Sequence, residues 1–377
     1  MYQALYRKWR PKVFSDVIGQ EHITETLKKQ VAEGRTSHAY LFTGTRGTGK
    51  TTCAKILAKA VNCEHPVNGD PCCQCPSCIG LESGSFLDVL ELDAASNNGV
   101  DQVRALRDEA IYAPANVKKR VYIVDEVHML STAAFNALLK ILEEPPAHLM
   151  FILATTELHK VPATILSRCQ RYSFKRILPK DIARRLTYVA QQEQIDLTPD
   201  GAELLSRLAD GALRDGLSLL DQCAAAGGTV DSRAVLEVLG LAGNLQTAQL
   251  MRDILDRNAQ AALLLLNELY TGGKDVGAVL GELSTLTRDL LLRKTAPEGG
   301  AALLSGGFDS ATLDKLGSGV PANRFLFLAS TLQKAAGDLY YSADRRTDAE
   351  LCILKLCDQS LSGDWTALVS RVKKLES

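Results

Sequence analysis

The stretch GTRGTGKT, residues 44–51, decides the fold. It fits the pattern G-x-x-x-x-G-K-[ST], in which a glycine-rich loop cradles the phosphates of a nucleotide. The apolar run 39–42 before it predicts a strand, and the Ala/Leu/Lys-rich run 49–62 predicts a helix after it. Backbone N–H groups and a helix N-terminus would then converge on the phosphates. A plain glycine turn between a strand and a helix is the alternative, and this flanking pattern disfavours it.

The residue types of this loop predict separate roles in nucleotide binding. Lys50 is expected to meet the β- and γ-phosphates, and the Thr51 hydroxyl is expected to bind Mg²⁺. The remaining contacts expected from the loop are Gly44, Thr45, Arg46, Gly47, Thr48, Gly49 and Thr52. The sequence therefore predicts a site for ATP and Mg²⁺.

Short apolar runs alternate with longer helical patterns as far as about residue 174. The expected strands are AYLFT (39–43), FLDVLEL (86–92), RVYIVDEV (120–127) and MFILATT (150–156), and the expected helices cover 49–62, 100–111 and 131–143. That order predicts an α/β fold whose parallel sheet carries helices on both faces.

Polar residues follow two of the expected strands. Asp125 and Glu126 end the strand that begins at Arg120. An acid at this place holds Mg²⁺ through water, and its neighbour is placed to polarise the attacking water. A solvated pair of acids is the alternative. Thr155 and Thr156 end the next strand, at the edge where open α/β sheets bind ligands, although threonine is common at strand ends.

An arginine follows in ILSRCQRY, residues 165–172. Arg168 lies near the same sheet edge in the sequence pattern, where an arginine is able to stabilise charge on a γ-phosphate. On these residues alone, an ordinary surface arginine is the favoured interpretation.

Taken together, these motifs resemble the clamp-loader branch of the AAA+ ATPases, and within it the gamma/tau family of bacterial DNA polymerase III. The resemblance is close over the first 240 residues and looser beyond them. It rests on ALYRKWRPKVFSDVIGQEH (4–22), HAYLFTGTRGTGKTT (38–52), DEVHMLS (125–131), FNALLKILEEPP (135–146), LRDGLSLLDQ (213–222) and, near the end, YYSADRRTDAELCILKL (340–356).

The resemblance implies residue roles that spacing does not give. Thr155, in preference to Thr156, would be the sensor 1 residue. Arg214 would be sensor 2 and touch the γ-phosphate of its own ATP. Arg168 would reach the ATP of a neighbouring subunit, so that hydrolysis requires an oligomer. The adenine pocket would be walled by Arg10, Pro11, Val17 and Ile18.

The resemblance also implies an activity and a set of partners. The chain would hydrolyse ATP to open a sliding clamp and load it on primer-template DNA during replication. Its partners would be the delta and delta-prime subunits and further copies of itself. A polymerase core and a helicase would join them if the full-length product has a C-terminal tail. DNA contacts are expected near residues 97–99 and 131–132, where a capped surface helix is the alternative.

Two other functions are weighed against this one. The first is a scaffold subunit that holds a nucleotide without turnover, which the presence of Lys50, Glu126 and Arg168 disfavours. The second is a Holliday-junction-type AAA+ helicase, which is not expected to carry the Ser-Arg-Cys motif or the cysteine cluster described below.

The strand pattern ends after about residue 178. Three or four short helices are expected over 180–240, and longer Leu/Ala-rich helices over 243–375, interrupted by a Gly-rich loop at 297–307. We therefore expect three domains. They are an AAA+ ATPase domain over 1–178, a helical lid over 179–242 and an all-α collar for oligomerisation over 243–377.

The charge and hydropathy of the chain limit how it could meet nucleic acid or a membrane, and any DNA contact must be local or shared among subunits. Lys and Arg number 43 against 44 Asp and Glu, so no bulk positive field draws the protein to nucleic acid or to an anionic membrane. The N-terminus has no apolar signal region, and no run reaches the length of a membrane span. We expect a cytoplasmic protein.

A cluster of cysteines lies in NCEHPVNGDPCCQCPSC, residues 62–78. Cys72, Cys75 and Cys78 are separated by two residues each, the short spacing that thiolates use around a tetrahedral ion, and Cys63 is the expected fourth ligand. Cys73 is expected to be spare. The pattern predicts a structural Zn²⁺ site that folds an insertion at about 62–80, a stretch with little core of its own.

Two rival interpretations of the cluster are disfavoured. An iron–sulfur cluster usually takes its fourth cysteine downstream, and the next one here is Cys169. A disulfide does not suit a reducing compartment. The gamma/tau resemblance agrees with zinc, since that family carries a zinc module at this point of the chain.

Overall fold

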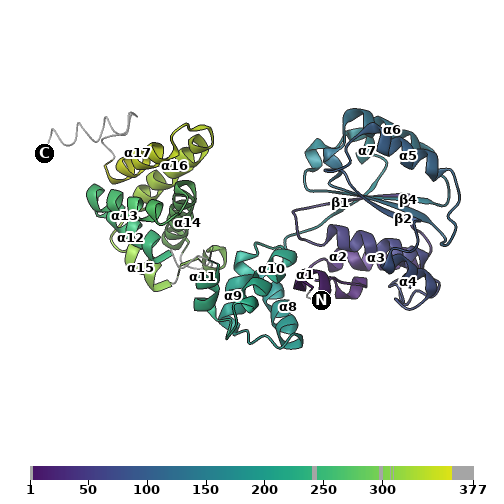
Figure 1. Cartoon of the computed structure of the whole chain (residues 1–377), viewed down its shortest axis with the longest axis horizontal. Coiled ribbons are helices and arrows are strands. Elements are labelled where there is room, and N and C mark those ends of the chain that lie inside the picture. The colour runs from purple at the N-terminus through teal and green to yellow at the C-terminus, as the bar shows by residue number, and fades with distance from the viewer. Residues whose placement is uncertain (1–2, 240–243, 297–299, 306, 309, 359–377) are drawn as a thin grey trace. The chain divides into compact units, whose positions relative to one another are not determined.

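The computed structural model describes residues 3–239, 244–296, 300–305, 307–308 and 310–358. The chain forms two compact units that divide between Val230 and Asp231 (Figure 1). The finer division into three domains stays a prediction. Among the described helices, none is both long enough and apolar enough to cross a bilayer.

The first unit is built on a parallel sheet. Within the described residues the strand order is β2-β3-β4-β1-β5, and every neighbouring pair is parallel. The strands are β1 (Ala39–Thr43), β2 (Val89–Asp93), β3 (Arg120–Asp125), β4 (Leu149–Thr155) and β5 (Gln170–Ser173). The expected α/β fold with a parallel sheet is confirmed. β5 is not among the expected strands, because this edge strand has largely exposed, polar residues.

Helices cover both faces of the sheet (Figure 1). Since side chains alternate along a strand, Leu41 of β1 joins one core with α5, α6 and α7, while Tyr40 and Phe42 join the opposite core with α2 and α3. The bounds of these helices are α2 (Glu21–Ala32), α3 (Lys50–Asn62), α5 (Val100–Ala110), α6 (Thr132–Glu143) and α7 (Ala163–Leu166).

The local sequence explains where α6 starts. The hydroxyl of Ser131 accepts a hydrogen bond from the Ala134 N–H, which satisfies one of the free donors of the first turn. Phe135, Leu138 and Leu142 are buried on one face of the helix, as their spacing predicts.

Three further short elements belong to the first unit. α1 (Leu5–Lys8) and the 3-10 turn η1 (Phe14–Asp16) precede α2, and α4 (Pro76–Ser83) lies in the insertion between α3 and β2. After the sheet come α8 (Pro179–Gln192), α9 (Pro199–Leu208) and α10 (Leu213–Ala225), which we call the lid helices. They bury Ile182, Leu186, Leu205 and Leu220.

The second unit is helical throughout its described residues. Its core gathers apolar side chains along α14 and α16, among them Leu283, Leu286, Phe325 and Leu328. Its helices are α11 (Ser232–Val238), α12 (Asn244–Leu255), α13 (Ala259–Thr271), α14 (Val276–Thr295), α15 (Ser310–Gly317), α16 (Ala322–Asp338) and α17 (Arg345–Cys357). The expected C-terminal helical domain is confirmed.

One detail of the expected collar differs from the prediction, and another lies outside the described residues. The Gly-rich stretch contains a 3-10 turn, η5 (Gly300–Leu303), rather than loop alone. The helical pattern expected beyond Cys357, to about residue 375, lies outside the described residues.

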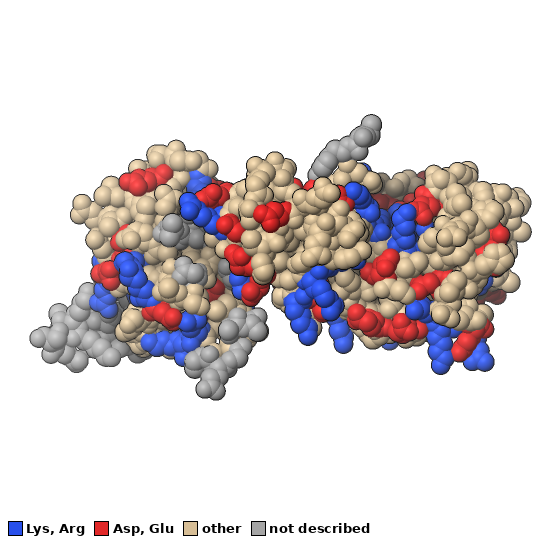
Figure 2. Space-filling view, turned by 90° about the horizontal axis from the view of Figure 1, so that it is seen from below, with Lys and Arg blue, Asp and Glu red and all other residues tan. Residues whose placement is uncertain are grey.

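The surface charge is mixed. On the face shown in Figure 2, Lys and Arg side chains are interspersed with Asp and Glu side chains in both units. This matches the near-balance of 43 basic and 44 acidic residues.

Candidate functional site

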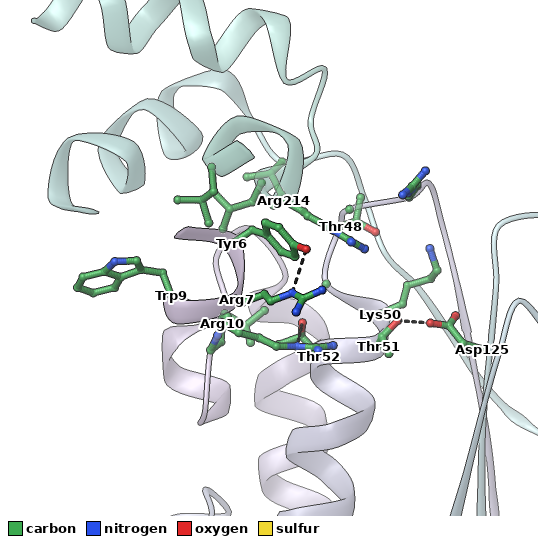
Figure 3. A pocket seen from close by; sticks show the side chains of 18 of the residues that line it. Tyr6, Arg7, Trp9, Arg10, Thr48, Lys50, Thr51, Thr52, Asp125 and Arg214 are labelled. Carbon is green, nitrogen blue, oxygen red and sulfur yellow. Dashed lines mark hydrogen bonds between the residues drawn. The ribbon is translucent and has the colours of Figure 1, made fainter. Parts of the chain in front are cut away.

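A cavity of about 1040 Å³ brings the phosphate loop, the N-terminal segment and the start of α10 together. Its lining contains most of the nucleotide contacts expected from the sequence (Figure 3). These residues are Arg10, Pro11, Val17, Ile18, Arg46, Gly47, Thr48, Gly49, Lys50, Thr51, Thr52, Asp125, Glu126 and Arg214.

Two positions of the loop require glycine, because neighbouring residues leave no room for a side chain. A Cβ on Gly44 would lie 2.4 Å from the Phe174 carbonyl oxygen, and a Cβ on Gly47 would lie 2.6 Å from Ala212 Cβ. Both glycines also have positive φ, 141° and 77°, which L side chains rarely adopt. The phosphate loop therefore touches the residue that precedes α10.

Lys50 opens α3 and turns back into the loop. Its Nζ donates hydrogen bonds to the carbonyl oxygens of Gly44 at 2.8 Å and Thr45 at 2.9 Å. Burial lowers the pKa of Lys50, and the acids Glu126 and Asp125 partly oppose that shift. The two expected contacts that do not line the cavity, Gly44 and Thr45, thus hold the lysine.

The two acids after β3 have different surroundings. Asp125 Oδ2 accepts a hydrogen bond of 2.6 Å from the Thr51 hydroxyl. Glu126 adopts a left-handed backbone conformation with φ of 47°, and its Oε2 accepts hydrogen bonds from the N–H of Thr156 at 3.2 Å and from the Thr156 hydroxyl at 3.0 Å. The two acids therefore contact different segments, Asp125 the start of α3 and Glu126 the residue after β4.

The two threonines after β4 contact different partners. Thr155 is fully buried, lies 3.1 Å from His128 Nδ1 through its Oγ1, and accepts a hydrogen bond from the Glu157 N–H. Thr156 contacts Glu126 instead. His128, which sequence reasoning did not single out, also lies 3.4 Å from Glu126 Oε2.

Arg168 and Thr155 are not among the described residues that line the cavity. Arg168 donates to Glu143 Oε1 at 2.7 Å and to the Thr164 carbonyl oxygen at 2.7 Å. Within one chain, therefore, the structure does not bring Arg168 together with Lys50.

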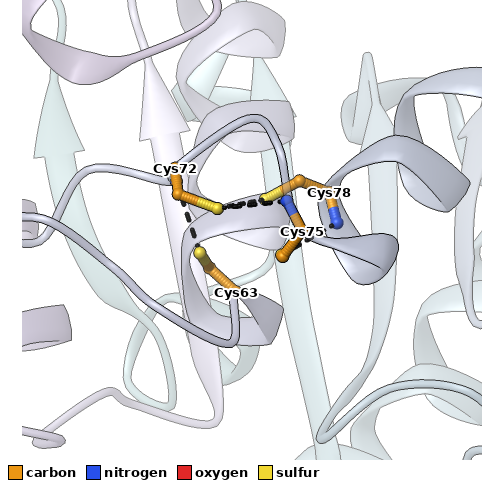
Figure 4. Close-up of side chains that lie close together, drawn as sticks. All are labelled: Cys63, Cys72, Cys75 and Cys78. Atoms are coloured by element: carbon orange, nitrogen blue, oxygen red, sulfur yellow. Dashed lines mark hydrogen bonds between the residues drawn. The ribbon is translucent and has the colours of Figure 1, made fainter.

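The cysteine cluster lies where α3 ends and α4 begins (Figure 4). The Sγ atoms of Cys63, Cys72, Cys75 and Cys78 all lie within 4.8 Å of one another, and those of Cys72 and Cys78 are 4.0 Å apart. Four thiolates about 2.3 Å from a tetrahedral Zn²⁺ would be about 3.8 Å apart. The donor set therefore fits this ion.

Backbone N–H groups point at the same sulfurs. The Cys72 N–H donates to Cys63 Sγ at 3.3 Å, and the Cys75 N–H donates to Cys72 Sγ at 3.3 Å. The Cys78 N–H donates to Cys75 Sγ at 3.4 Å. Hydrogen bonds from Gln74 and Cys75 lower the pKa of Cys72 to about 6, because they stabilise the thiolate. Burial raises the pKa values of Cys63 and Cys78, so the hydrogen bonds favour the thiolate at Cys72 whereas burial favours the neutral thiol at Cys63 and Cys78.

Cys73 stands apart from the cluster. Its backbone is left-handed, with φ of 57°, and its Sγ faces the carbonyl oxygens of Pro71 at 3.6 Å and Lys12 at 3.8 Å. It is not one of the four grouped cysteines.

The loop of the insertion is held against the first unit by hydrogen bonds. Asp70 accepts hydrogen bonds of 2.6 Å from the Phe14 N–H and from the Ser15 hydroxyl. The Lys118 ammonium donates to the Cys63 carbonyl oxygen at 2.8 Å. The insertion that carries the four cysteines therefore contacts the N-terminal segment and the segment just before β3.

Three family models match successive parts of the chain between residues 19 and 370. They are described as "DNA polymerase III, delta subunit" over 19–177, "DNA polymerase III clamp loader subunit, ATPase lid domain" over 181–229, and "DNA polymerase III subunits gamma and tau domain III" over 230–370. The DNA polymerase III subunit gamma of Buchnera aphidicola is 41% identical over 283 residues, 75% of this chain and 78% of that protein. The chain belongs to the DNA polymerase III gamma/tau family.

Longer relatives of the same family support this assignment. The tau subunit of Bacillus subtilis is 46% identical over 360 residues, 95% of this chain and 64% of that protein. The tau subunit of Escherichia coli is 41% identical over 359 residues, 94% of this chain and 55% of that protein. This gamma/tau chain thus spans less than two thirds of the length of these two tau subunits. The family resemblance in the sequence is confirmed.

The two segments of this gamma/tau chain expected to touch DNA lie side by side. The Ser131 N–H donates to the Asn98 carbonyl oxygen at 3.2 Å, so the start of α6 adjoins the turn that precedes α5. The Ser131 hydroxyl caps α6, as the surface-helix alternative also requires. The DNA contacts stay a prediction.

Sequence reasoning on the gamma/tau chain missed an aromatic residue of the cavity. Tyr6 lines it, and the guanidinium carbon of Arg214 lies 4.8 Å from the centre of its ring. The tyrosine stands in ALYRKWRP, a stretch that contributed to the family resemblance only as a whole. Nothing in the spacing of residues 6 and 214 signals that they meet.

Proposed function

We propose that this chain is the ATP-hydrolysing subunit of a DNA polymerase III clamp loader, which opens a sliding clamp and places it on primer-template DNA. The observation that carries the proposal is the convergence of Lys50, the Thr51–Asp125 pair and Glu126 on one cavity beneath the lid helices. A loop that only bound phosphate would not need Glu126 beside Thr51 and Asp125, the two proposed magnesium contacts.

The positive charge in the cavity suits a nucleoside triphosphate. Arg10, Arg46, Lys50 and Arg214 all line it, and cations converging on one space favour a polyphosphate. Bound Mg²⁺ would neutralise charge on the β- and γ-phosphates. Lys50 would exchange its loop carbonyls for phosphate oxygens, since the carbonyl oxygens of Gly44 and Thr45 accept its hydrogen bonds in the structure.

Three residues are assigned to the hydrolytic step itself. Glu126 would orient and polarise the attacking water, with its carboxylate placed by Thr156. Arg214, as sensor 2, lines the cavity and would contact the γ-phosphate. Thr155, as sensor 1, is fully buried outside the cavity lining and would sense the γ-phosphate only after its hydroxyl turns from His128 toward the cavity. Adenine would lie against the wall formed by Arg10, Pro11, Val17 and Ile18.

Arg168 is assigned to the ATP of a neighbouring subunit. Its position outside the cavity of its own chain supports this role, because it leaves the site without its arginine until another subunit supplies one. Hydrolysis and assembly would then be coupled, and the clamp and DNA could control turnover by aligning Arg168.

The assembly would contain delta, delta-prime and further copies of this chain, and the collar over 243–377 would hold them together. The lid over 179–242 would connect it to the ATPase domain over 1–178. Zn²⁺ would hold the insertion at about 62–80 through Cys63, Cys72, Cys75 and Cys78. A four-thiolate site is closed to water, so its role is structural.

The experiment that tests the proposal measures clamp loading. The chain is assembled with delta and delta-prime, and transfer of a labelled clamp to primed circular DNA is followed with ATP and with a non-hydrolysable analogue. Stable transfer with ATP and reduced release with the analogue are expected. Equal release in both conditions would favour the scaffold subunit without turnover.

A further inference from the structure

We propose that Tyr6 is a positioning residue that holds Arg214 at the phosphate side of the cavity and thereby helps the site to distinguish ATP from ADP. The inference rests on the proposed function, since it takes Arg214 to be the residue that senses the γ-phosphate. The family models match from residue 19 onward, so they do not cover Tyr6.

The Arg214 guanidinium lies over the face of the Tyr6 ring. Tyr6 belongs to α1 and Arg214 to the first turn of α10, and the Arg214 guanidinium carbon lies 4.8 Å from the centre of the Tyr6 ring. In Figure 3, Arg214 passes over Tyr6 and points toward the side of the cavity formed by Thr48. A ring face attracts a guanidinium at this distance.

Electrostatics explain why Arg214 needs such a support. Arg7, Arg10, Arg46 and Lys50 line the same cavity, and like charges repel. The effect is visible at Arg10, whose pKa is lowered, chiefly by burial. The carboxylate of Glu91 opposes this shift, and the positive charge of Arg214 adds to it. Without the ring, a flexible arginine would turn away from its cationic neighbours toward water.

The Tyr6 ring and α1 have further contacts besides the one with Arg214. The Tyr6 hydroxyl accepts a hydrogen bond of 3.0 Å from Arg7 Nε. The Leu5 N–H donates to Asp221 Oδ2 of α10 at 3.3 Å, and the Trp9 indole N–H donates to Glu193 Oε1 at 2.8 Å. α1 is therefore attached to the lid helices at both of its ends.

The lid is in turn fixed to the phosphate loop near Arg214. The Cβ atom of Ala212, two residues before Arg214, would lie 2.6 Å from a Cβ on Gly47. This contact sets the distance from α10 to the loop, whereas the Tyr6 ring sets the direction of the Arg214 side chain.

The test measures the affinities of the full 377-residue chain for ATPγS and for ADP by calorimetry. The variants are Tyr6→Leu, Tyr6→Phe, Arg214→Ala and the double variant Tyr6→Leu/Arg214→Ala. Tyr188→Leu is the matched control, because Tyr188 packs on Trp9 in the same contact between α1 and the lid but does not face Arg214. Thermal unfolding of each variant checks folding, and Tyr6→Met replaces Tyr6→Leu if the latter does not fold.

We expect Tyr6→Leu to weaken ATPγS binding about three- to tenfold, the range that a cation–π contact supports, with little change for ADP. Tyr6→Phe and Tyr188→Leu should stay within about twofold of the wild type, and the double variant should bind ATPγS no more weakly than Arg214→Ala, because one interaction cannot be lost twice.

Four results would overturn the inference. Equal weakening of ATPγS and ADP by Tyr6→Leu would make the ring a general support, and additive losses in the double variant would separate Tyr6 from Arg214. If Arg214→Ala weakens ATPγS binding while Tyr6→Leu does not, the inference alone fails. If Arg214→Ala itself leaves ATPγS binding intact, the sensing role in the proposed function fails, and the role of Tyr6 fails with it.

Discussion

The Thr51 hydroxyl donates a hydrogen bond of 2.6 Å to Asp125 Oδ2, and so joins the first turn of α3 to the carboxyl end of β3. Both residues are proposed to hold Mg²⁺, directly through Thr51 and through water at Asp125. The same contact fixes the phosphate loop against the sheet edge where Glu126 lies.

Thr51→Val should raise the Mg²⁺ concentration that gives half-maximal ATP turnover by roughly tenfold or more, because it removes a metal ligand and a partner of Asp125. The measurement is a magnesium titration of ATPase activity in the assembled complex. Thr52→Val is the matched control, since the Thr52 hydroxyl accepts from Arg10 Nε at 3.2 Å. An unchanged magnesium requirement in Thr51→Val would contradict the assignment.

Cys75→Ser should lose most of the bound zinc, because three thiolates remain where a closed site needs four. Cys73→Ser should retain it, because Cys73 faces backbone carbonyls outside the cluster. Metal analysis of both purified variants makes the comparison. Nucleotide binding should survive in both, since the cluster lies outside the lining of the nucleotide cavity. A full zinc content in Cys75→Ser would refute the ligand set.

Gly47→Ala should weaken ATP binding at least tenfold, because its Cβ would lie 2.6 Å from Ala212 Cβ and push the lid from the loop. Part of any effect comes from the positive φ of 77°, which costs about 1–2 kcal/mol for an alanine. Gly34→Ala supplies that control, since Gly34 has φ of 68° and open space around its Cβ. Comparable ATP affinities in both variants would show that the lid contact is unimportant.

Arg168→Ala subunits mixed with Lys50→Ala subunits should recover some ATPase activity if the arginine acts on a neighbour. Each mixed interface can pair an intact Lys50 with an intact Arg168 from the other subunit. The measurement is the ATPase rate of assemblies reconstituted from the two variants at several ratios. Mixtures no more active than either variant alone would indicate an arginine that acts within its own chain.

Local spacing explains what the sequence could predict. The phosphate loop, the Asp125–Glu126 pair and the cysteine cluster each lie within a short stretch, so residue type and spacing carry the signal. β5 could not be predicted, because an edge strand of mostly exposed residues lacks the apolar run that marks the inner strands.

Contacts between distant segments were beyond this reasoning. The Tyr6–Arg214 pair and the approach of Ala212 to Gly47 depend on how α1 and α10 pack beside the loop. The choice between Thr155 and Thr156 came from the family resemblance, and only the structure separates their partners, His128 and Glu126. Such contacts arise from tertiary packing, which no local pattern encodes.

The most direct test of the account is the ATPase rate of the reconstituted clamp loader with sliding clamp and primed DNA. The wild-type complex should show turnover that clamp and DNA stimulate, and Glu126→Gln should bind ATP but lose turnover by roughly a hundredfold or more, as expected when a general base is removed. Full turnover in Glu126→Gln would contradict the catalytic assignment at the centre of this account.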